Sequence, residues 1–439
     1  MTLNDFLEKY NLKSLNDLSD NINKHGKNLP VEFVYQAAEY LNPNRDTTAA
    51  YYTDTDICKH IIAELPSFEN LDHIRILEPS AGAGNFIPFI AERYKDKHIL
   101  ELYLVDIDEA ELQIAELIFE TYYREKYPNV HIIYLKDDYL DFPVSGKKFD
   151  LVIGNPPYAK VKDFKLNRKY RKNSKITKSS NLFVWFLEKA IKDGDWVSLI
   201  VPKSVLNAPE YEEIRNQINN THIASILDFG ENGFKGVKIE TVNLLYTTTL
   251  QPSKTHIVSV TQKIDIYQKQ TYFTDNSYPV WLLYRNNFFD EFATSLKLGV
   301  FEAFRDRQIV NSMLSPSGRY RVLKSRNIAS NAIRDIEDYD SYMDNIDSLL
   351  VSKFLNKQNV VLVPNLSYAP RACFLPPNTI ANGSVALLTL KDNSFEITQE
   401  DLSLFATEDF TLYYRIARNY GTRSLNIDNN SVYFFGIRR

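Results

Sequence analysis

The segment that decides the fold is residues 74–94, which read IRILEPSAGAGNFIPFIAERY. Its first residues, Ile74–Leu77, form an apolar run that predicts a buried strand, and the apolar spacing over Phe86–Tyr94 predicts a helix. Between them, Gly82 and Gly84 permit a tight strand-to-helix turn and let a ligand approach the backbone. A strand, a glycine turn and a helix in this order are typical of a parallel α/β sheet.

The same alternation of short apolar runs and amphipathic stretches continues along the chain. Further strands are predicted at Leu100–Val105, His131–Leu135, Phe149–Ile153, Trp196–Val201 and Ile223–Phe229, with further helices at Glu109–Lys126, Leu182–Ile191 and Glu210–Asn219. The pattern fades after about residue 250, and the length of 439 residues suits two or three domains. We therefore expect a helical N-terminal extension (1–45), an α/β domain with a mostly parallel mixed sheet (46–250) and a mixed α/β domain (251–439).

Charge is distributed unevenly along the chain. The net charge is -5, yet residues 1–158 hold 15 Lys and Arg against 27 Asp and Glu, and the later residues hold 36 against 29. Basic residues are concentrated directly after Tyr158, where Lys160, Lys162, Arg168, Lys169, Arg171 and Lys172 are candidates to contact the phosphates of a nucleic acid. The alternative for this stretch is a mobile, solvated loop.

Composition excludes several classes of protein. The two cysteines, Cys58 and Cys373, have neither a CxxC nor a Cys/His ligand spacing, so we expect no disulfide framework and no metal site. No apolar run approaches the roughly 20 residues that a membrane span requires. These features indicate a cytoplasmic protein with no membrane partner.

Acidic residues follow three successive strands of the predicted sheet. Glu78 ends the first strand, where a carboxylate can order the amides of the glycine turn and face a cationic ligand. Asp106 ends the second strand, beside the ribose of a nucleoside held over the first turn. Asp138 ends the third strand and can accept a hydrogen bond from an adenine amine, with Tyr139 as an aromatic edge. Because Ile87 breaks the dinucleotide fingerprint and no Gly-Lys-Ser/Thr occurs, the sequence predicts an adenosine pocket without phosphate binding.

The segment FDLVIGNPPY (149–158) leads from a fourth strand into Asn155, Pro156, Pro157 and Tyr158. The two prolines fix an extended turn and remove two N–H donors, so the local polar groups are mostly acceptors. The Asn155 side-chain oxygen and the Pro156 carbonyl can each accept a hydrogen of an N6 amine, whose lone pair can then point at an electrophilic methyl group. Tyr158 offers a ring on which the base can stack. The alternative is a turn with no chemical role.

From about Asn44 onward, these motifs resemble the gamma group of N6-adenine-specific DNA methyltransferases, the Taq-type family. The resemblance implies S-adenosylmethionine as the cofactor, bound by Thr53, Glu78, Ala81, Gly82, Gly84, Asp106, Ile107, Asp138, Tyr139 and Asn155. It implies catalysis by Asn155, Pro156, Pro157 and Tyr158. Phe234, within GENGFKGV (230–237), would stack on the flipped adenine opposite Tyr158. The family's Thr-Pro in the upstream motif is Thr53-Asp54 here.

The same resemblance implies a Rossmann-like S-adenosylmethionine-dependent methyltransferase domain followed by a target-recognition domain. We therefore expect an enzyme that flips an adenine out of double-stranded DNA and methylates its N6 amine, as the modification enzyme of a bacterial restriction-modification or related defence system. It would be a monomer that acts beside a separate restriction endonuclease. Two alternatives are N5-methylation of protein glutamine, by enzymes that share Asn-Pro-Pro-Tyr, and a non-catalytic DNA-recognition subunit.

Overall fold

The structure, a computed structural model, describes residues 1–43, 53–143, 146–172, 174–231, 239–366, 369–392, 394–422 and 426–439. The chain forms two compact units. The first comprises Met1–Val205 and Glu210–Thr271, and the second comprises Leu206–Pro209 and Tyr272–Arg439. The first unit thus continues beyond residue 250, where the sequence pattern led us to place a domain boundary.

A nine-stranded sheet forms the centre of the first unit, in the order β3-β2-β1-β4-β5-β7-β6-β8-β9. Its strands are β1 (His73–Glu78), β2 (Ile99–Asp106), β3 (Val130–Lys136), β4 (Phe149–Gly154), β5 (Gly194–Pro202), β6 (His222–Gly230), β7 (Thr241–Thr247), β8 (Lys254–Ser259) and β9 (Ile264–Lys269). Strands β1 to β5 pair with one another in parallel, and β7 runs antiparallel between β5 and β6. The expected α/β fold with a mostly parallel mixed sheet is confirmed.

Strands β8 and β9 account for the greater length of the first unit. β8 pairs in parallel with β6, and β9 pairs antiparallel with β8, so both strands extend the large sheet. The residues of β9 alternate between half-buried and exposed, as is usual at the edge of a sheet. Such a weakly apolar segment gives little signal for a strand in the sequence.

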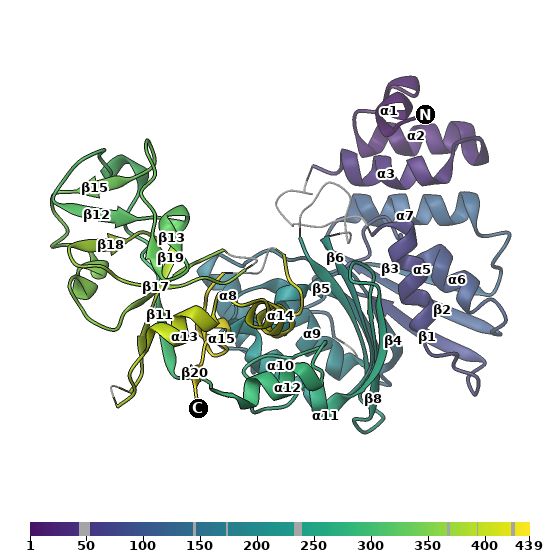
Figure 1. The fold of residues 1–439 in the computed structure, drawn as a ribbon. Coiled ribbons are helices and arrows are strands. Elements are labelled where there is room, and N and C mark those ends of the chain that lie inside the picture. Colours follow the sequence, from purple (N-terminus) through teal and green to yellow (C-terminus); the bar gives the residue numbers. More distant parts are fainter. Residues whose placement is uncertain are drawn as a thin grey trace. The chain divides into compact units, whose positions relative to one another are not determined.

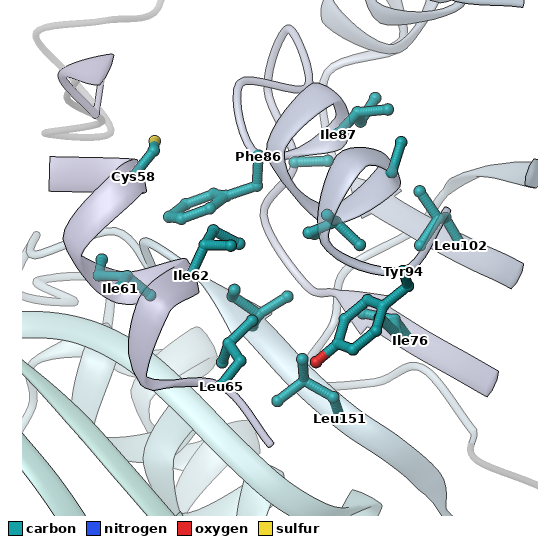
Figure 2. Packing of buried hydrophobic residues seen from close by; sticks show 14 of the residues in the cluster. Cys58, Ile61, Ile62, Leu65, Ile76, Phe86, Ile87, Tyr94, Leu102 and Leu151 are labelled. Carbon is teal, nitrogen blue, oxygen red and sulfur yellow. The ribbon is translucent and has the colours of Figure 1, made fainter. Parts of the chain in front are cut away.

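Helices pack against the sheet and bury its apolar residues. They are α5 (Thr55–Glu64), α6 (Ile87–Arg93), α7 (Glu109–Tyr122), α9 (Leu182–Asp193) and α10 (Glu212–Asn219), whereas α8 (Phe164–Arg171) has no buried residue. Figure 2 shows side chains of α5 and α6 meeting Ile76 of β1, Leu102 of β2 and Leu151 of β4. Tyr94, directly after α6, is 2% exposed, and its hydroxyl donates a hydrogen bond to the Pro66 carbonyl at 2.9 Å. This core fixes the strand ends that carry the site.

Three amino-terminal helices, α1 (Leu3–Lys9), α2 (Leu15–His25) and α3 (Val31–Leu41), form a layer on α7 (Figure 1). Phe6, Leu18 and Val34 from this layer share a buried cluster with Ile114 and Ile118 of α7. The layer is therefore packed onto the sheet-bearing unit through a continuous apolar interface.

The second unit combines short helices with several small sheets. One sheet has the order β11-β19-β16-β17 and another the order β15-β12-β18. The strands of these two sheets are β11 (Phe301–Phe304), β12 (Tyr320–Leu323), β15 (Ser341–Met343), β16 (Val361–Pro364), β17 (Cys373–Phe374), β18 (Thr379–Ala381) and β19 (Val385–Leu390). The longer helices are α12 (Asn287–Thr294) and α14 (Glu408–Ala417). In the described part of the chain, no helix has the length and apolar character needed to cross a membrane.

Candidate functional site

A cavity of about 770 Å³ lies in the first unit, where the carboxyl ends of β1 to β4 meet. Its size is typical of a small-molecule site. It brings together most of the predicted site residues, namely Thr53, Glu78, Ala81, Gly82, Asp106, Ile107, Asp138, Tyr139, Asn155 and Pro157. Its described lining includes the acidic side chains of Glu39, Glu78, Asp106, Asp108, Glu109, Glu111, Asp137 and Asp138, against the ammonium of Lys136. Lys136 already pairs with Glu109 at 2.7 Å, so the cavity suits a cationic ligand.

Two buried acceptor atoms border the cavity without a hydrogen-bond partner among the described residues. They are Oε2 of Glu78, which ends β1, and Oδ1 of Asn85, in the glycine turn. Burial, and to a lesser degree the Asp106 carboxylate, raises the pKa of Glu78 well above its usual range. Since an unpaired buried acceptor is costly, both atoms are suited to a donor or cation that a ligand supplies. The sequence analysis did not single out Asn85, although it lies in the turn that was quoted.

Asp106 at the end of β2 organises the glycine turn. Its Oδ2 accepts a hydrogen bond from the Gly82 amide at 2.8 Å, and its Oδ1 accepts one from the Asp108 amide at 2.9 Å. Burial raises the pKa of Asp106, while these amides act in the opposite direction. Because each carboxylate oxygen has a second acceptor position, the side chain can hold the turn and still accept hydrogen bonds from a ligand. Ile107, whose side chain is 62% exposed, presents an apolar surface to the cavity beside it.

The end of β3 contributes Asp138 and Tyr139 in different ways. Asp138 Oδ1 accepts a hydrogen bond from the Leu140 amide at 3.0 Å, and Oδ2 accepts one from the Tyr170 hydroxyl at 2.6 Å. Tyr139 is 1% exposed, and its hydroxyl donates a hydrogen bond to Asp193 at 2.9 Å. Tyr139 therefore belongs to the wall of the cavity, with its hydroxyl anchored in the protein interior. Tyr170, which the sequence analysis had placed in a basic stretch without a role of its own, also borders the cavity.

The Asn155 side chain at the end of β4 lies in a small hydrogen-bond network. The Tyr158 hydroxyl donates to Asn155 Oδ1 at 2.7 Å, and Asn155 Nδ2 donates to Thr53 Oγ1 at 3.5 Å. The Ser80 hydroxyl donates to the Asn155 carbonyl at 3.0 Å. This network assigns the amide orientation, with the oxygen toward Tyr158 and the nitrogen toward Thr53. It also connects the upstream Thr53 motif to the Asn-Pro-Pro-Tyr turn, which the sequence did not reveal.

Three of the predicted cofactor-binding and catalytic residues, Gly84, Pro156 and Tyr158, are not among the residues that line the cavity. Gly84 has a φ of +77°, and an added Cβ would clash with Ile87 Cδ1, so glycine is needed for the packing of the turn, and its assignment as a cofactor contact stays a prediction. Pro156 is buried, and Tyr158 is half-buried. Phe234 lies outside the described residues.

The amino-terminal layer supplies one wall of the cavity. This wall is lined by Tyr35 and Glu39 of α3, by Asn42, which follows α3, and by Glu111 of α7. Asn42 Nδ2 donates a hydrogen bond to Glu111 Oε1 at 2.6 Å, and Glu111 is 5% exposed. No local sequence signal marks these residues, because the wall forms only when segments some seventy positions apart pack together.

Glu111 provides a pH-dependent test of this wall. Burial raises the pKa of Glu111 to about 8 from an ordinary 4.5, with Asp106, Asp108 and Glu39 adding to the shift. The folded state therefore holds one more proton than the unfolded state between these values, and stability falls as pH rises through this window. Glu111→Gln removes the titration but keeps the acceptor for Asn42.

We expect the free energy of unfolding of Glu111→Gln, relative to wild type, to rise by roughly 2 kcal/mol between about pH 6 and pH 8. Urea denaturation at the two pH values measures this difference. Glu116→Gln, exposed on the same helix, is the matched control and should show no such change. An equal pH dependence for wild type and Glu111→Gln would mean that Glu111 ionises normally.

The basic stretch forms a helix over part of its length. α8 begins after Asp163, whose carboxylate accepts a hydrogen bond from the Leu166 amide at 2.7 Å, and ends at Arg171. The phosphate contacts that we expected, at Lys160, Lys162, Arg168, Lys169, Arg171 and Lys172, are all exposed. Thus part of the stretch is an ordered helix, where a solvated loop was the alternative.

Comparison with known proteins gives a match over the sheet. Residues 100–234 match the family model described as Eco57I restriction-modification methylase. The chain is similar to restriction-modification methylases. Modification methylase CviBIII of Paramecium bursaria Chlorella virus NC1A is 30% identical over 185 residues, which are 40% of this chain and 44% of that protein. Type II methyltransferase M.CvrRI of Paramecium bursaria Chlorella virus XZ-6E is 28% identical over 201 residues, 44% of this chain and 47% of that protein.

The matches thus span less than half the length of either relative. Among solved structures, that of the Type IIL restriction-modification enzyme MmeI in complex with DNA has a TM-score of 0.60 at 12% identity, covering 91% of this chain and 70% of that chain. At this identity the likeness concerns the fold. Together with the sheet topology it shows an α/β fold with a mostly parallel mixed sheet.

Proposed function

We propose that this chain is a site-specific DNA methyltransferase that transfers a methyl group from S-adenosylmethionine to the N6 amine of adenine, as a restriction-modification enzyme. The observation that carries the proposal is the position of Asn155. Its amide lies at the carboxyl end of β4, in the wall of an acid-lined cavity, and is oriented by Tyr158 and Thr53. An oriented amide oxygen beside a site for a cationic methyl donor is what methylation of a weakly nucleophilic amine requires.

The cavity residues fit S-adenosylmethionine. When bound, this cofactor supplies an electrophilic methyl group on a sulfonium cation. The unpaired Glu78 Oε2 and Asn85 Oδ1 can accept hydrogen bonds from its ammonium group, and Asp106 has acceptor positions left for ribose hydroxyls. Ile107 offers an apolar surface for a base.

Asn155 performs the positioning of the acceptor amine. Its Oδ1 already accepts the Tyr158 hydroxyl, and a carbonyl oxygen has a second acceptor position for an amine hydrogen. An amine held in this way turns its lone pair toward the cavity, where Thr53 borders the same wall. The catalytic contribution is therefore orientation and electrostatics, with no covalent intermediate on the protein. An adenine in a duplex must first be flipped out to reach this position, and in the proposal Phe234 stacks on it.

DNA is favoured as the substrate by α8 and the residues around it. Lys165, Arg168 and Lys172 make no ion pair with any described residue, so their charges are available to phosphates. Residues 251–439 remain our candidate for target recognition, and within them β8 and β9 belong to the sheet. In this proposal the enzyme acts as a monomer beside a separate endonuclease.

We expect the triple variant Lys165→Gln, Arg168→Gln, Lys172→Gln to bind duplex DNA with a weaker salt dependence. Each phosphate contact contributes about 0.9 to the slope of log K against log salt concentration, so the slope should fall by about 2 to 3. Fluorescence anisotropy with a labelled duplex at several salt concentrations measures it. The triple variant Lys27→Gln, Lys95→Gln, Lys126→Gln removes the same charge from exposed lysines paired with Glu125 and Glu92 and is the control. Equal slopes for the two variants would place the phosphates elsewhere.

The function is tested by incubation with methyl-labelled S-adenosylmethionine and mixed-sequence duplex DNA. Digestion of the DNA to nucleosides and mass spectrometry should show N6-methyladenine. Label on a glutamine side chain of added protein substrate would favour the glutamine methyltransferase instead. DNA binding without any transfer would favour a non-catalytic recognition subunit.

A further inference from the structure

Helix α8 has two faces of different character. Its half-buried residues are Leu166, Asn167 and Tyr170, spaced so that they lie on one side of the helix. Its exposed residues include the cations Lys165, Arg168, Lys169 and Arg171. One short helix thus carries a protein-facing side and a strongly basic side.

The protein-facing side reaches the cofactor cavity through Tyr170. The Tyr170 ring borders the cavity and packs on Trp185 with ring centroids 5.3 Å apart. Its hydroxyl donates a hydrogen bond to Asp138 Oδ2 at 2.6 Å. Asp138 Oδ1 is held by the Leu140 amide, so Tyr170 completes the fixation of this cavity carboxylate.

A second contact attaches the same helix to the same loop. Lys169, next to Tyr170, forms an ion pair with Asp141, and the Asp141 amide donates to the Asp138 carbonyl at 2.9 Å. Two neighbouring side chains of α8 therefore hold the loop that follows β3. One of them, Lys169, belongs to the cations that we expect to contact DNA, and its ammonium group has three donors, so it can bind a phosphate while it stays paired with Asp141.

We propose that α8 couples DNA binding to cofactor binding, with Tyr170 as the positioning residue that transmits the coupling through Asp138. This inference rests on the proposed function, because it needs both ligands. When a cofactor fills the cavity, the hydrogen bond from Tyr170 to Asp138 fixes α8, so the cations of this helix are held in one position. When DNA phosphates bind those cations, they fix α8 and so maintain the same hydrogen bond. Such coupling is reciprocal: the factor by which DNA tightens cofactor binding equals the factor by which the cofactor tightens DNA binding.

Tyr170→Phe is the variant that tests this coupling. It removes the hydroxyl and keeps the ring packed on Trp185, so the fold should persist, which a thermal melt verifies. Tyr134→Phe is the matched control, since the Tyr134 hydroxyl is buried on β3 without a hydrogen-bond partner among the described residues and does not border the cavity. Calorimetry with S-adenosylmethionine is performed on the full chain alone and with a saturating mixed-sequence 30-base-pair duplex at low salt.

For wild type and Tyr134→Phe, we expect DNA to lower the Kd for S-adenosylmethionine by about 5-fold to 150-fold, the usual range of such coupling. For Tyr170→Phe, we expect a higher Kd without DNA and a coupling factor close to 1, with an unchanged Kd for DNA alone. A coupling factor in Tyr170→Phe equal to that of wild type overturns the inference, as does the absence of coupling in wild type. Failure of wild type to bind S-adenosylmethionine at all would instead overturn the proposed function.

Discussion

Replacement of Asn155 by alanine should lower the rate of methyl transfer by about 100-fold to 1,000-fold, the usual effect of removing one preorganised polar group from an active site. Asn155 Oδ1 is held by the Tyr158 hydroxyl at 2.7 Å and is the group that would accept the adenine amine. Cofactor binding should change little, because the Asn155 contact with Thr53 is long, at 3.5 Å, and the carboxylates of Glu78, Asp106 and Asp138 stay in place. Single-turnover kinetics and calorimetry measure the two quantities separately.

Asn129→Ala is the control for this experiment. Asn129 directly precedes β3, at the amino-terminal end of this strand, whereas the cavity lies at the carboxyl ends of the strands. Its side chain donates one hydrogen bond, to the Lys97 carbonyl at 3.0 Å. The control therefore loses a comparable hydrogen bond away from the cavity and should retain full activity. If Asn155→Ala transfers methyl groups as fast as Asn129→Ala, the amide does not position the acceptor amine.

Replacement of Glu78 by glutamine should weaken S-adenosylmethionine binding by about 10-fold to 100-fold, the equivalent of a lost charge-assisted hydrogen bond. Glu78 is 3% exposed and its Oε2 has no partner among the described residues, so its ionised form gains most from a bound cation. Burial raises the pKa of Glu78 and a bound cation favours its ionised form, so affinity should increase as pH rises through that pKa. Glutamine removes this pH dependence. Calorimetry at several pH values measures both effects.

The stability of Glu78→Gln separates a binding role from a structural one. Burial disfavours the charged carboxylate, so the neutral amide should leave the free energy of unfolding unchanged or higher. Glu101→Gln, near the start of the neighbouring strand β2 and paired with Arg75, is the control and should bind the cofactor normally. Equal affinity and equal pH dependence in Glu78→Gln and wild type would show that another group receives the cation.

Much of the fold could be predicted because each central strand is an apolar run that can be recognised from its own residues. The runs that became β1 and β4 are apolar and almost wholly buried, and the ends of parallel strands converge on one edge of a sheet. The converging acids Glu78, Asp106 and Asp138 could therefore be placed in one cavity from sequence. Strand β9 could not be predicted, because an edge strand with alternating exposure resembles a surface segment.

The rest of the site depends on contacts between distant segments. Tyr170 lies in a basic stretch, where charge dominated the interpretation, and its meeting with Asp138 joins residues 32 positions apart. Glu111 lies in the first turn of α7, where acidic residues are common, so the sequence does not reveal its contact with Asn42, which follows α3. Gly84 lies close to the Ile87 side chain, a contact that the sequence does not reveal, because a glycine turn indicates backbone freedom without saying whether a ligand or a side chain occupies the space.

The layer formed by α1, α2 and α3 limits how far this protein can be truncated from its amino terminus. Its length and position invite removal as an accessory segment, yet Tyr35, Glu39 and Asn42 at its carboxyl end border the cavity. A shortened chain that retains the cavity must therefore keep α3 and the surface of α7 on which α3 packs. Additions are better tolerated than deletions at this end, since α1 lies at the start of the layer and none of its residues borders the cavity.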